Sequence, residues 1–405
     1  MTAAMKTFGE ASALIASHVA PLEIETVPLS AGAGRVLAAD IRAAIPSPRH
    51  SVSAMDGYAV RESDIAGGEP VQVAGEARPG APFAGVLPAG EAVRIFTGAP
   101  LPDGADCVIM QEYAQRDADT VRFAAGFGPA KHVRQRGSDF EEGAVLLRRG
   151  TRLDAKTLVA AAAADVAEIT VHRQPAIAII ATGDELAEPG SAQLAPYAIP
   201  DTTSLAIASL AQDAGARVTS RCRAQDDLPA LERQAGELLE SADIVIVIGG
   251  ASVGDRDFAK PMFAPHGLAL VFDRLAIKPG KPLSFGRIGQ ALFLGLPGNP
   301  VAAFVTWTLF AKPLCHRLSG ATDGLRTARL VRADTPLQHK IGRCEYRPAT
   351  IVGRDDQGRE VVHLGPQVHS AQLAPLVGCD GLVRLPGDVK ELPLGSMLEF
   401  LPFEG

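Results

Sequence analysis

The sequence predicts a multidomain α/β protein whose central part is a doubly wound, mostly parallel sheet with helices on both faces. Three observations lead to this prediction. All-apolar segments typical of buried strands alternate with helical segments over residues 174–320. Residues 46–138 instead consist of short β-like runs divided by glycine and proline, and residues 325–405 have short strands and turns with little helical periodicity. At 405 residues the chain exceeds the size at which one core stops growing, so about three or four domains are expected.

The composition is that of a folded protein without affinity for nucleic acid. Hydrophobic residues make up 47% of the chain and charged residues 21%, which supplies packed cores and excludes a disordered chain. The formal net charge of −7 provides no overall positive field that would attract nucleic acid. Any anion site must therefore be local.

The cysteines and the apolar segments indicate a reduced environment away from membranes. The five cysteines are far apart, odd in number and form no C-x-x-C, so neither a disulfide framework nor a zinc site is indicated. The longest apolar stretches, such as "LVAAAAADVA" and "DIVIVIGG", are too short to span a bilayer. The first residues have neither the charged region nor the apolar region of a secretion signal. We therefore expect a cytoplasmic protein without membrane insertion.

The N-terminal segment predicts a capped helix. In "TFGEASALIASHV", Thr7 and Glu10 have the spacing of a capping box. Phe8, Ala11 and Ile15 fall on one face of this helix, which predicts the face that packs on a core.

Changes in sequence texture predict the domain boundaries. We expect residues 1–45 and 139–173 to form a discontinuous N-terminal domain, because the Ala-rich helix "DAKTLVAAAAADVA" of the second segment can pack back on the first. Residues 46–138 are then an inserted β-rich domain. Residues 174–324 form the α/β domain, and residues 325–405 form a C-terminal β barrel.

Strand and helix segments alternate in order through the α/β part. "AIAIIAT" predicts a buried strand, "TTSLAIASLAQDAG" a capped helix that ends at Gly215, "ARVTSRCRA" a strand and "LPALERQAGELLES" a helix. "DIVIVIGG", "GLALVFDRLAI" and "ALFLGL" predict further strands, and "NPVAAFVTWTLFAKPLCHRL" predicts the last helix. Such alternation specifies a parallel sheet that is covered on both faces.

Polar residues and glycines gather where these strands end. In an open α/β sheet, ligands bind outside the carboxyl ends of the strands, so these residues are expected to converge on one rim. In chain order they are Thr182, Gly183, Asp184 and Glu185; Asp226 and Asp227; Gly249, Gly250, Ser252, Gly254, Asp255 and Asp257; Lys278 and Lys281; and Gly298 and Asn299.

The residue types on this rim suit a phosphate-containing ligand and a hard metal ion. The carboxylates are oxygen ligands that suit Mg²⁺ held jointly with phosphate. The glycines of "GGASVG" let backbone N–H groups approach an anion, and "PGNP" opens a helix whose N-terminus favours negative charge. Lys278 and Lys281 put two positive charges on a turn stiffened by the proline after each, which predicts an oxyanion or phosphate clamp.

Each of these features also has a structural explanation. Two lysines in a turn are often simply solvated, Asp-Glu after a strand and "QDD" before a helix can be helix caps, and glycines commonly close strands. Only the convergence of all of them on one rim favours a functional site.

Several further stretches carry distinctive motifs. They are "SAMDGYAV", "RIFTGAPLPDGADCVIMQE", "VRQRGSDF", "ATGDEL", "GGASVGDRDF", "LAIKPGKP" and "LFLGLPGNPV". In this order and spacing, which extend over most of the chain, they resemble the molybdopterin molybdenumtransferase family, the MoeA type that includes the E domain of gephyrin. "MDGYA" and the pair "IKPGKP" and "GLPGNP" are the most distinctive.

This resemblance implies a cytosolic homodimer with an active site at the dimer interface. Members of the family have four domains per chain, of which the third is a molybdopterin-binding α/β domain. They insert molybdate into adenylylated molybdopterin and release AMP in a reaction that requires Mg²⁺. A molybdopterin adenylyltransferase is the implied source of the substrate.

The resemblance also implies roles for individual residues. The implied catalytic residues are Asp56, Asp139, Glu185, Asp226, Asp257, Lys278 and Lys281, of which Glu185, Asp226 and Asp257 would hold Mg²⁺. The implied substrate-binding residues are Thr97, Gly250, Ser252, Gly254, Pro297, Gly298, Asn299, Pro300, Arg347 and Ser370. The dithiolene of the pterin would supply soft ligands for molybdenum, so the chain's own cysteines need no role.

The chain departs from the family in two places and leaves some assignments open. "RHSV" stands upstream of "SAMDGYAV", where many relatives carry an aromatic–Asp–Asn run, and Ser370 lies in "GPQVHSAQL" rather than in the family's "GxQGSx". Asp56 can also form a tight turn with Gly57, and Thr97 can satisfy a turn with its hydroxyl.

Three other functions are compatible with such a chain. Molybdopterin adenylyltransferases attach AMP with a similar α/β domain, but they are short and carry "GGTG" where this chain has "GGASVG". A dimeric scaffold without catalysis would be expected to lose the rim lysines and carboxylates, which are present here. A nucleotide-phosphate hydrolase without a pterin is the third alternative.

Overall fold

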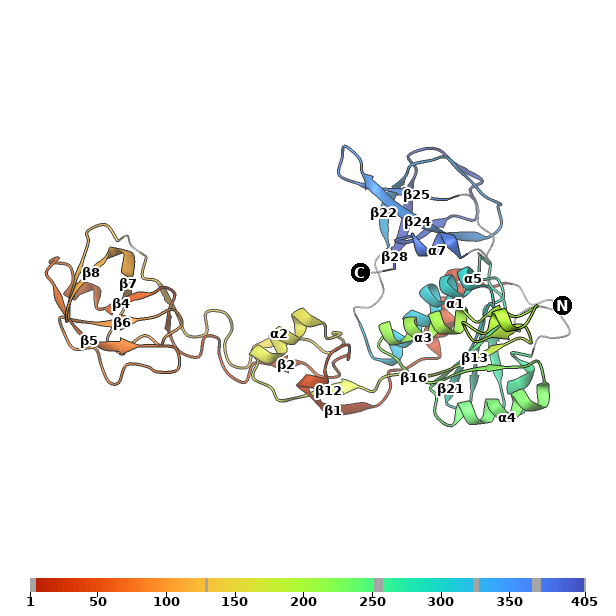
Figure 1. Ribbon diagram of the computed structural model, residues 1–405, viewed down its shortest axis with the longest axis horizontal. Helices are drawn as coiled ribbons and strands as arrows, with labels where there is room; N and C mark the ends of the chain where they lie inside the picture. Colours follow the sequence, from red (N-terminus) through yellow and green to blue (C-terminus); the bar gives the residue numbers. More distant parts are fainter. Residues whose placement is uncertain (1–4, 128–129, 251–257, 323–327, 366–372, 404–405) are drawn as a thin grey trace.

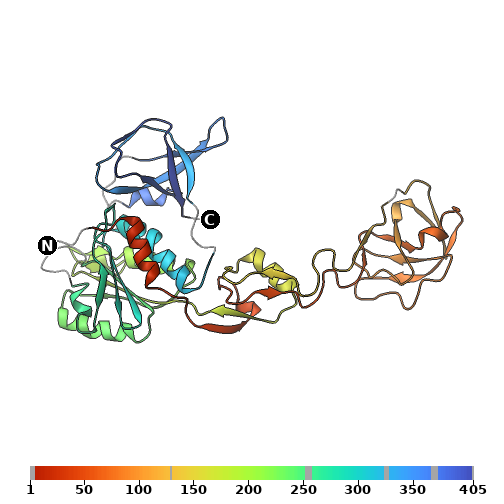
Figure 2. The same ribbon diagram turned by 180° about the vertical axis from the view of Figure 1, so that it is seen from behind.

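The molecule is elongated, and its elements gather into separate bodies along its length (Figures 1 and 2). The structure is a computed structural model. It describes residues 5–127, 130–250, 258–322, 328–365 and 373–403. A six-stranded sheet, which we call the central sheet, lies at one end beside a six-stranded C-terminal sheet. A third six-stranded sheet, the distal sheet, lies at the opposite end, and a small body lies between the two ends.

The central sheet is mostly parallel, as the sequence predicts. Its strand order is β16-β13-β17-β21-β20-β18. The first four strands pair in parallel, whereas β20 is antiparallel to both of its neighbours. The strands are β16 (Arg217–Ala224), β13 (Ala176–Thr182), β17 (Ile244–Ile248), β21 (Ala291–Leu296), β20 (Ser284–Ile288) and β18 (Ala269–Phe272).

Helices cover both faces of the central sheet because its strands are apolar on both sides. Every residue of β13 and of β17 is buried, which is why these segments read as continuous apolar runs. Alternate residues of β13 pack on opposite faces. Ile177 packs on the face that carries α3 (Thr203–Asp213), and Ala178 packs on the face that carries α4 (Leu228–Leu239).

The N-terminal helix α1 (Phe8–Ser17) packs against the core of the central sheet. The predicted capping box is present: Glu10 N–H donates to Thr7 Oγ1 at 3.2 Å, and Thr7 N–H donates to Glu10 Oε2 at 2.8 Å. Ala11 and Ile15 are buried in the same cluster as the strand residues of the sheet.

The predicted last helix of the α/β part contains a π turn. The α-helices α5 (Pro300–Thr306) and α6 (Lys312–Leu318) flank a π-helical segment, Trp307–Ala311. Pro313 has no N–H, so the carbonyl group of Leu309 cannot receive the usual i→i−4 hydrogen bond, which accounts for the wider turn. Within the described part of the chain, no helix is both long enough and apolar enough to cross a bilayer.

The segment "GLALVFDRLAI", predicted to be one strand, is divided between two sheets. β18 ends at Phe272, and β20, which the sequence does not predict, returns along it in the opposite direction. β19 (Ile277–Lys278) instead pairs in parallel with β24 (Cys344–Arg354) of the C-terminal sheet. After β18, Leu275 N–H donates to the Lys281 carbonyl at 2.9 Å, which closes a loop around the turn that carries Lys278 and Lys281, here called the lysine turn.

The C-terminal sheet closes into a barrel. Its order is β19-β24-β25-β22-β28-β26, and β24 also pairs with β26, which joins the two sides. Its core includes Val331, Val383 and Phe400. The strands not yet given are β25 (Glu360–His363), β22 (Arg329–Ala333), β28 (Met397–Pro402) and β26 (Gly381–Leu385).

The distal sheet is joined to the rest by two-stranded ladders. Its strands, in sheet order, are β7 (Cys107–Met110), β4 (Gly57–Val60), β6 (Glu91–Ile95), β5 (Val71–Ala77), β9 (Thr120–Phe123) and β8 (Ala114–Asp117). The intermediate body contains the pairs β1 (Ile24–Pro28) with β12 (Glu168–His172) and β2 (Ile41–Arg42) with β11 (Val145–Leu147), together with α2 (Ala155–Ala163). The predicted multidomain α/β fold with a β-rich insertion and a C-terminal barrel is therefore confirmed.

Gly57, in the "MDGYA" motif, has no room for a side chain. A Cβ atom there would lie 1.9 Å from the carbonyl oxygen of Ile109 on the neighbouring strand β7. We expect Gly57→Ala to lower the free energy of unfolding of the distal sheet by about 3 kcal/mol, because the strands must move apart. Urea denaturation measures this change. Gly67→Ala is the matched control, since nothing lies within 4 Å of its Cβ position, and equal effects of the two changes would contradict the prediction.

Candidate functional site

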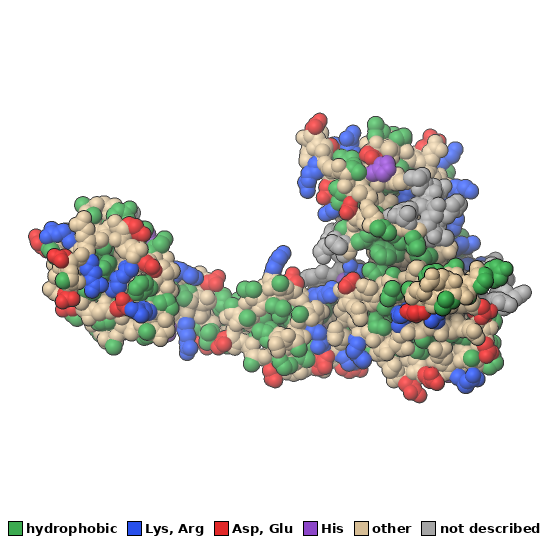
Figure 3. Space-filling model, viewed as in Figure 1, with side chains coloured by type: hydrophobic (Ala, Val, Ile, Leu, Met, Phe, Trp, Pro, Cys, Tyr) green, Lys and Arg blue, Asp and Glu red, His purple; other side chains and the backbone are tan. Residues whose placement is uncertain are grey.

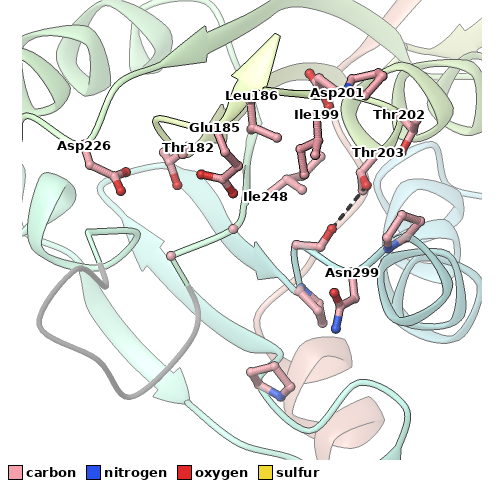
Figure 4. A pocket seen from close by; sticks show the side chains of 18 of the residues that line it. Thr182, Glu185, Leu186, Ile199, Asp201, Thr202, Thr203, Asp226, Ile248 and Asn299 are labelled. Atoms are coloured by element: carbon pink, nitrogen blue, oxygen red, sulfur yellow. Dashed lines mark hydrogen bonds between the residues drawn. The ribbon is translucent and has the colours of Figure 1, made fainter. Parts of the chain in front are cut away.

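A cavity of about 920 Å³ opens at the carboxyl edge of the central sheet (Figure 4). It is bounded by the ends of β13 and β17, the starts of α3 and α5, and the turn that follows β18. Its lining residues are Thr182, Gly183, Glu185, Leu186, Ile199, Pro200, Asp201, Thr202, Thr203, Asp226, Ile248, Gly249, Gly250, Arg274, Lys281, Pro282, Pro297, Gly298, Asn299, Pro300 and Leu373.

The cavity brings together many of the residues that the sequence predicts to be functional. Those that line it are Thr182, Gly183, Glu185, Asp226, Gly249, Gly250, Lys281, Pro297, Gly298, Asn299 and Pro300. Ser252, Gly254, Asp255, Asp257 and Ser370 lie outside the residues that the structure describes. The remaining predicted residues lie elsewhere in the fold, as described below.

One side of the cavity is acidic. Glu185 follows β13 and Asp226 follows β16, and in Figure 4 their carboxylates lie on either side of the Thr182 hydroxyl. The ends of the two strands are tied together because Asp226 N–H donates to Asp184 Oδ1 at 3.0 Å. Glu185 and Asp226 therefore present hard oxygen donors, which fit Mg²⁺.

The described residues do not by themselves complete a metal site. Nowhere in the described ranges do three or more His, Cys, Asp or Glu side chains form a group that could hold a metal ion. Glu185 and Asp226 supply two of the three predicted ligands, and the third, Asp257, is not described.

A glycine turn after β17 forms the floor of the cavity. Gly249 and Gly250 have φ angles of +93° and +57°, which side-chain-bearing residues rarely adopt. A Cβ atom on Gly249 would lie 2.7 Å from the carbonyl oxygen of Thr182, so the two strand ends can approach only without a side chain. Backbone groups are thereby exposed to a ligand at this position.

Two helices begin at the cavity. The first turn of α3 is capped by the buried Asp201, whose Oδ1 accepts a hydrogen bond from Ser204 N–H at 3.0 Å. Asn299 is the residue before α5. Thr203 Oγ1 donates to the Gly298 carbonyl at 3.2 Å and joins the two helix starts, as the dashed line in Figure 4 shows. Helix N-termini favour negative charge, so this side of the cavity suits phosphate.

Two basic residues complete the lining. Lys281 is exposed and Arg274 is half-buried, and both belong to the loop between β18 and β20. The cavity thus combines carboxylates on one side with ammonium, guanidinium and helix N-termini on the others. Such an arrangement can bind a phosphorylated ligand together with a divalent cation.

Some parts of the lining are not predicted from the sequence. Among them are the first turn of α3, with Thr202 and Thr203, and Arg274, as well as the segment that supplies Leu186, Ile199, Pro200 and Asp201. A signal for the first exists, because the helix after β13 in a parallel sheet must begin at the same edge as the strand ends. The signal for Arg274 is its place in "FDRLAIKPGK", four residues before Lys278.

Lys278 does not line the cavity with Lys281 but forms part of a buried charge cluster with the C-terminal sheet. Lys278 Nζ lies 3.4 Å from Glu345 Oε2, and the two residues are register partners in β19 and β24. The other oxygen of Glu345 accepts hydrogen bonds from Arg347, at 3.2 Å from Nε and 3.0 Å from Nη2. Glu345 and Arg347 are 4% and 5% exposed. One carboxylate is therefore shared by two cations.

The predicted residues Asp56, Thr97 and Asp139 lie outside the cavity lining. Thr97 donates from its backbone N–H and from Oγ1 to Asp56 Oδ1, both at 2.7 Å. These hydrogen bonds, the backbone one first, hold the pKa of Asp56 below its ordinary value and keep it ionised. Asp56 precedes β4 of the distal sheet, which lies at the other end of the molecule from the central sheet (Figures 1 and 2). Ser47 Oγ donates to Asp139 Oδ2 at 3.5 Å.

Two family descriptions match most of the chain. "MoeA N-terminal region (domain I and II)" matches residues 6–164, and "Probable molybdopterin binding domain" matches residues 178–317.

Curated relatives and solved structures match over nearly all of the chain. A molybdopterin molybdenumtransferase from Haemophilus influenzae is 36% identical over 329 residues, which are 81% of each chain. Molybdopterin molybdenumtransferase 2 from Mycobacterium tuberculosis is 32% identical and covers 98% of this chain and 99% of its own. The molybdopterin biosynthesis MoeA protein from Pyrococcus horikoshii superposes with a TM-score of 0.81 at 27% identity, covering 99% of this chain and 100% of its own.

Removal of the shared carboxylate should destabilise the C-terminal sheet. Glu345→Gln leaves the buried Arg347 guanidinium without its counter-charge, so we expect a loss of about 3 kcal/mol or more in the free energy of unfolding. Chemical denaturation measures it. Glu399→Gln is the matched control: both Glu399 and its partner Arg384 on the same sheet are about half-exposed, and the expected loss is at most about 1 kcal/mol. A loss no larger than that of the control would contradict a buried ionic cluster.

Proposed function

Because this chain belongs to the molybdopterin molybdenumtransferase family, we propose that it inserts molybdate into adenylylated molybdopterin and releases AMP, giving the molybdenum cofactor. The observation that carries this proposal is the cavity at the carboxyl edge of the central sheet. It has carboxylates, two cations and two helix starts around one space of about 920 Å³, as a phosphoanhydride with a divalent cation requires.

The acidic side of the cavity would serve the metal. Glu185 and Asp226, with Asp257, would hold Mg²⁺, which supplies neutralisation of the phosphate oxygens when it is bound. Both described side chains offer oxygen donors on one wall, and this donor set suits a hard cation.

The basic side would stabilise the charge that develops on cleavage. Water or an oxygen of molybdate attacks the phosphorus on the pterin side of the anhydride, the P–O bond from that phosphorus to AMP breaks, and its electron pair leaves on the phosphate oxygen of AMP. Lys281 and Arg274 lie where they can neutralise the oxyanions of molybdate or of phosphate. The starts of α3 and α5 would hold a phosphate group through backbone N–H groups.

The pterin would supply the sulfur ligands for molybdenum. No cysteine is among the described residues that line the cavity. Burial raises the pKa of the Cys107 thiol to about 11 and that of the Cys315 thiol to about 12, so both stay protonated at neutral pH. These observations support our assignment of the thiolate ligands of the metal to the substrate.

A homodimer would complete the site. Asp56 and Thr97 lie beside the distal sheet, and Asp139 lies where the chain returns from it, so none of them lines the cavity of its own chain. We propose that a second copy of the chain brings these residues to the cavity of the first, in a cytoplasmic dimer with twofold symmetry. A molybdopterin adenylyltransferase would deliver the substrate.

The reaction is tested by AMP release from adenylylated molybdopterin. We expect AMP release by the wild-type protein to need both molybdate and Mg²⁺. We expect Lys281→Ala to lower kcat/KM about 100-fold, because it removes one preorganised charge beside a reacting oxyanion. Lys156→Ala, on the exposed face of α2, is the control that should retain wild-type values.

The outcomes separate the alternatives. Equal release without molybdate would favour a nucleotide-phosphate hydrolase, and attachment rather than release of AMP would favour an adenylyltransferase. Binding of the pterin without any release would favour a scaffold.

The shared site is tested by mixing two inactive variants. Chains with Asp56→Asn and chains with Lys281→Ala should each have only a small residual activity alone. In a mixed dimer one cavity receives both changes and the other receives neither, so random exchange should restore about a quarter of wild-type activity. AMP release after subunit exchange measures it. No recovery in mixed dimers of confirmed composition would contradict a site built from two chains.

A further inference from the structure

The wall of the cavity between Glu185 and Thr203 is built from a segment that projects from the central sheet. After Glu185 the chain forms β14 (Leu186–Ala187), passes through an exposed loop and returns as β15 (Ile199–Pro200). Ile199 N–H donates to the carbonyl of Glu185 at 2.8 Å. In Figure 4, Glu185 and Thr203 lie on opposite sides of Ile199. We call residues 186–204 the wall segment.

The outer part of the wall segment is poorly covered. Leu194 and Tyr197 in its loop are 82% and 92% exposed. The paired strands β14 and β15 are only two residues long each, and such short pairs have little stability of their own. Contacts elsewhere must therefore fix the position of the wall segment.

Two arginines of the edge strand β16 supply those contacts. Arg221 Nη2 donates to Glu188 Oε1 at 3.2 Å, and its Nη1 donates to Ser204 Oγ at 3.1 Å. Arg223 lies 3.4 Å from the other carboxylate oxygen of Glu188 and donates to the Leu186 carbonyl at 3.1 Å. Arg221 thus contacts both the beginning and the end of the wall segment.

Arg221 also neutralises a buried carboxylate. Asp201 is only 2% exposed, and it accepts hydrogen bonds from the backbone N–H and from the hydroxyl of Ser204. Arg221 Nη1 lies 3.8 Å from Asp201 Oδ2. A buried carboxylate needs such a partner, because an isolated charge is costly in a poorly solvated place.

The charges of this network balance one another. Arg221 and Arg223 carry two positive charges, and Glu188 and Asp201 carry two negative charges. Neither arginine lines the cavity, and of the four charged residues only Asp201 does. The network therefore has no excess charge with which to bind a substrate and can act only through the residues that it holds.

We propose that Arg221 is a positioning residue that fixes Glu185 and the first turn of α3 relative to each other, so that the adenylate end of the substrate meets a preformed site. This inference rests on the proposed function for its substrate. The guanidinium group of Arg221 connects Glu188, in the loop of the wall segment, with the Asp201–Ser204 cap of α3. A planar guanidinium group with several N–H donors suits this task better than an ammonium group.

The test compares binding with turnover in Arg221→Gln. We expect the Kd of AMP, measured by calorimetry without Mg²⁺, to rise about tenfold, because the α3 N-terminus no longer has a fixed position. The KM for adenylylated molybdopterin should rise by a similar factor. The KM for molybdate should stay within twofold, since Lys281 belongs to the separate loop between β18 and β20.

Three further variants control for loss of folding. Arg217→Gln changes an exposed arginine at the start of the same strand and should retain wild-type constants. Glu188→Gln removes the ion pairs of the half-exposed Glu188 but keeps the contact between Arg221 and Asp201. We expect this variant to be fully folded and to bind AMP with a Kd raised severalfold. Arg221→Lys should restore part of the AMP affinity, because an ammonium group can reach one of the two partners.

The results separate this inference from the proposed function. An unchanged Kd of AMP in both Arg221→Gln and Glu188→Gln would overturn the positioning role, and so would an equal rise in the KM values of both substrates. If the wild-type protein binds AMP and Arg221→Gln binds it tenfold more weakly, but no molybdate-dependent release occurs, then the proposed reaction fails while the positioning role stands.

Discussion

The parallel pairing of β13, β16, β17 and β21 is the constraint on which the rest of this structure depends. Strands that run in one direction deliver their carboxyl ends to one edge, and the helices that follow them begin at that same edge. Glu185, Asp226, the Gly249 turn and the start of α5 meet there although they lie far apart in the chain. β18 runs in the same direction as β21, because β20 is antiparallel to both, so the loop with Lys281 also opens at this edge.

The turn that carries Lys278 and Lys281 contacts both the cavity of the central sheet and the C-terminal barrel. Lys281 lines the cavity of the central sheet, whereas Lys278 pairs with Glu345 of the C-terminal barrel through both the strand register and the ion pair. Because Glu345 also accepts two hydrogen bonds from Arg347, the barrel is joined to the turn by a buried, charge-assisted contact. The position of the barrel and the shape of the turn are therefore coupled.

Binding groups and supporting groups are separated in this molecule. The cavity has carboxylates and cations on different walls, where each can meet a charged part of a ligand. Behind one wall, Arg221 and Arg223 are balanced by Glu188 and Asp201 and have no charge to spare. At the far end of the molecule, two hydrogen bonds from Thr97 orient the Asp56 carboxylate and hold its pKa below the ordinary value.

The sequence by itself determined the mostly parallel sheet, the capped first helix and the gathering of Glu185, Asp226, Lys281 and "PGNP" at one edge, because apolar periodicity and turn residues are local signals. Only the tertiary structure decided that Lys278 turns toward Glu345, and that Arg274 and the first turn of α3 join the lining. The tertiary structure alone also decided that β19 pairs with the C-terminal sheet and not with the central sheet. Those outcomes depend on contacts between segments far apart in the chain, such as the pairing of β19 with β24, and no local pattern of residues encodes such partners.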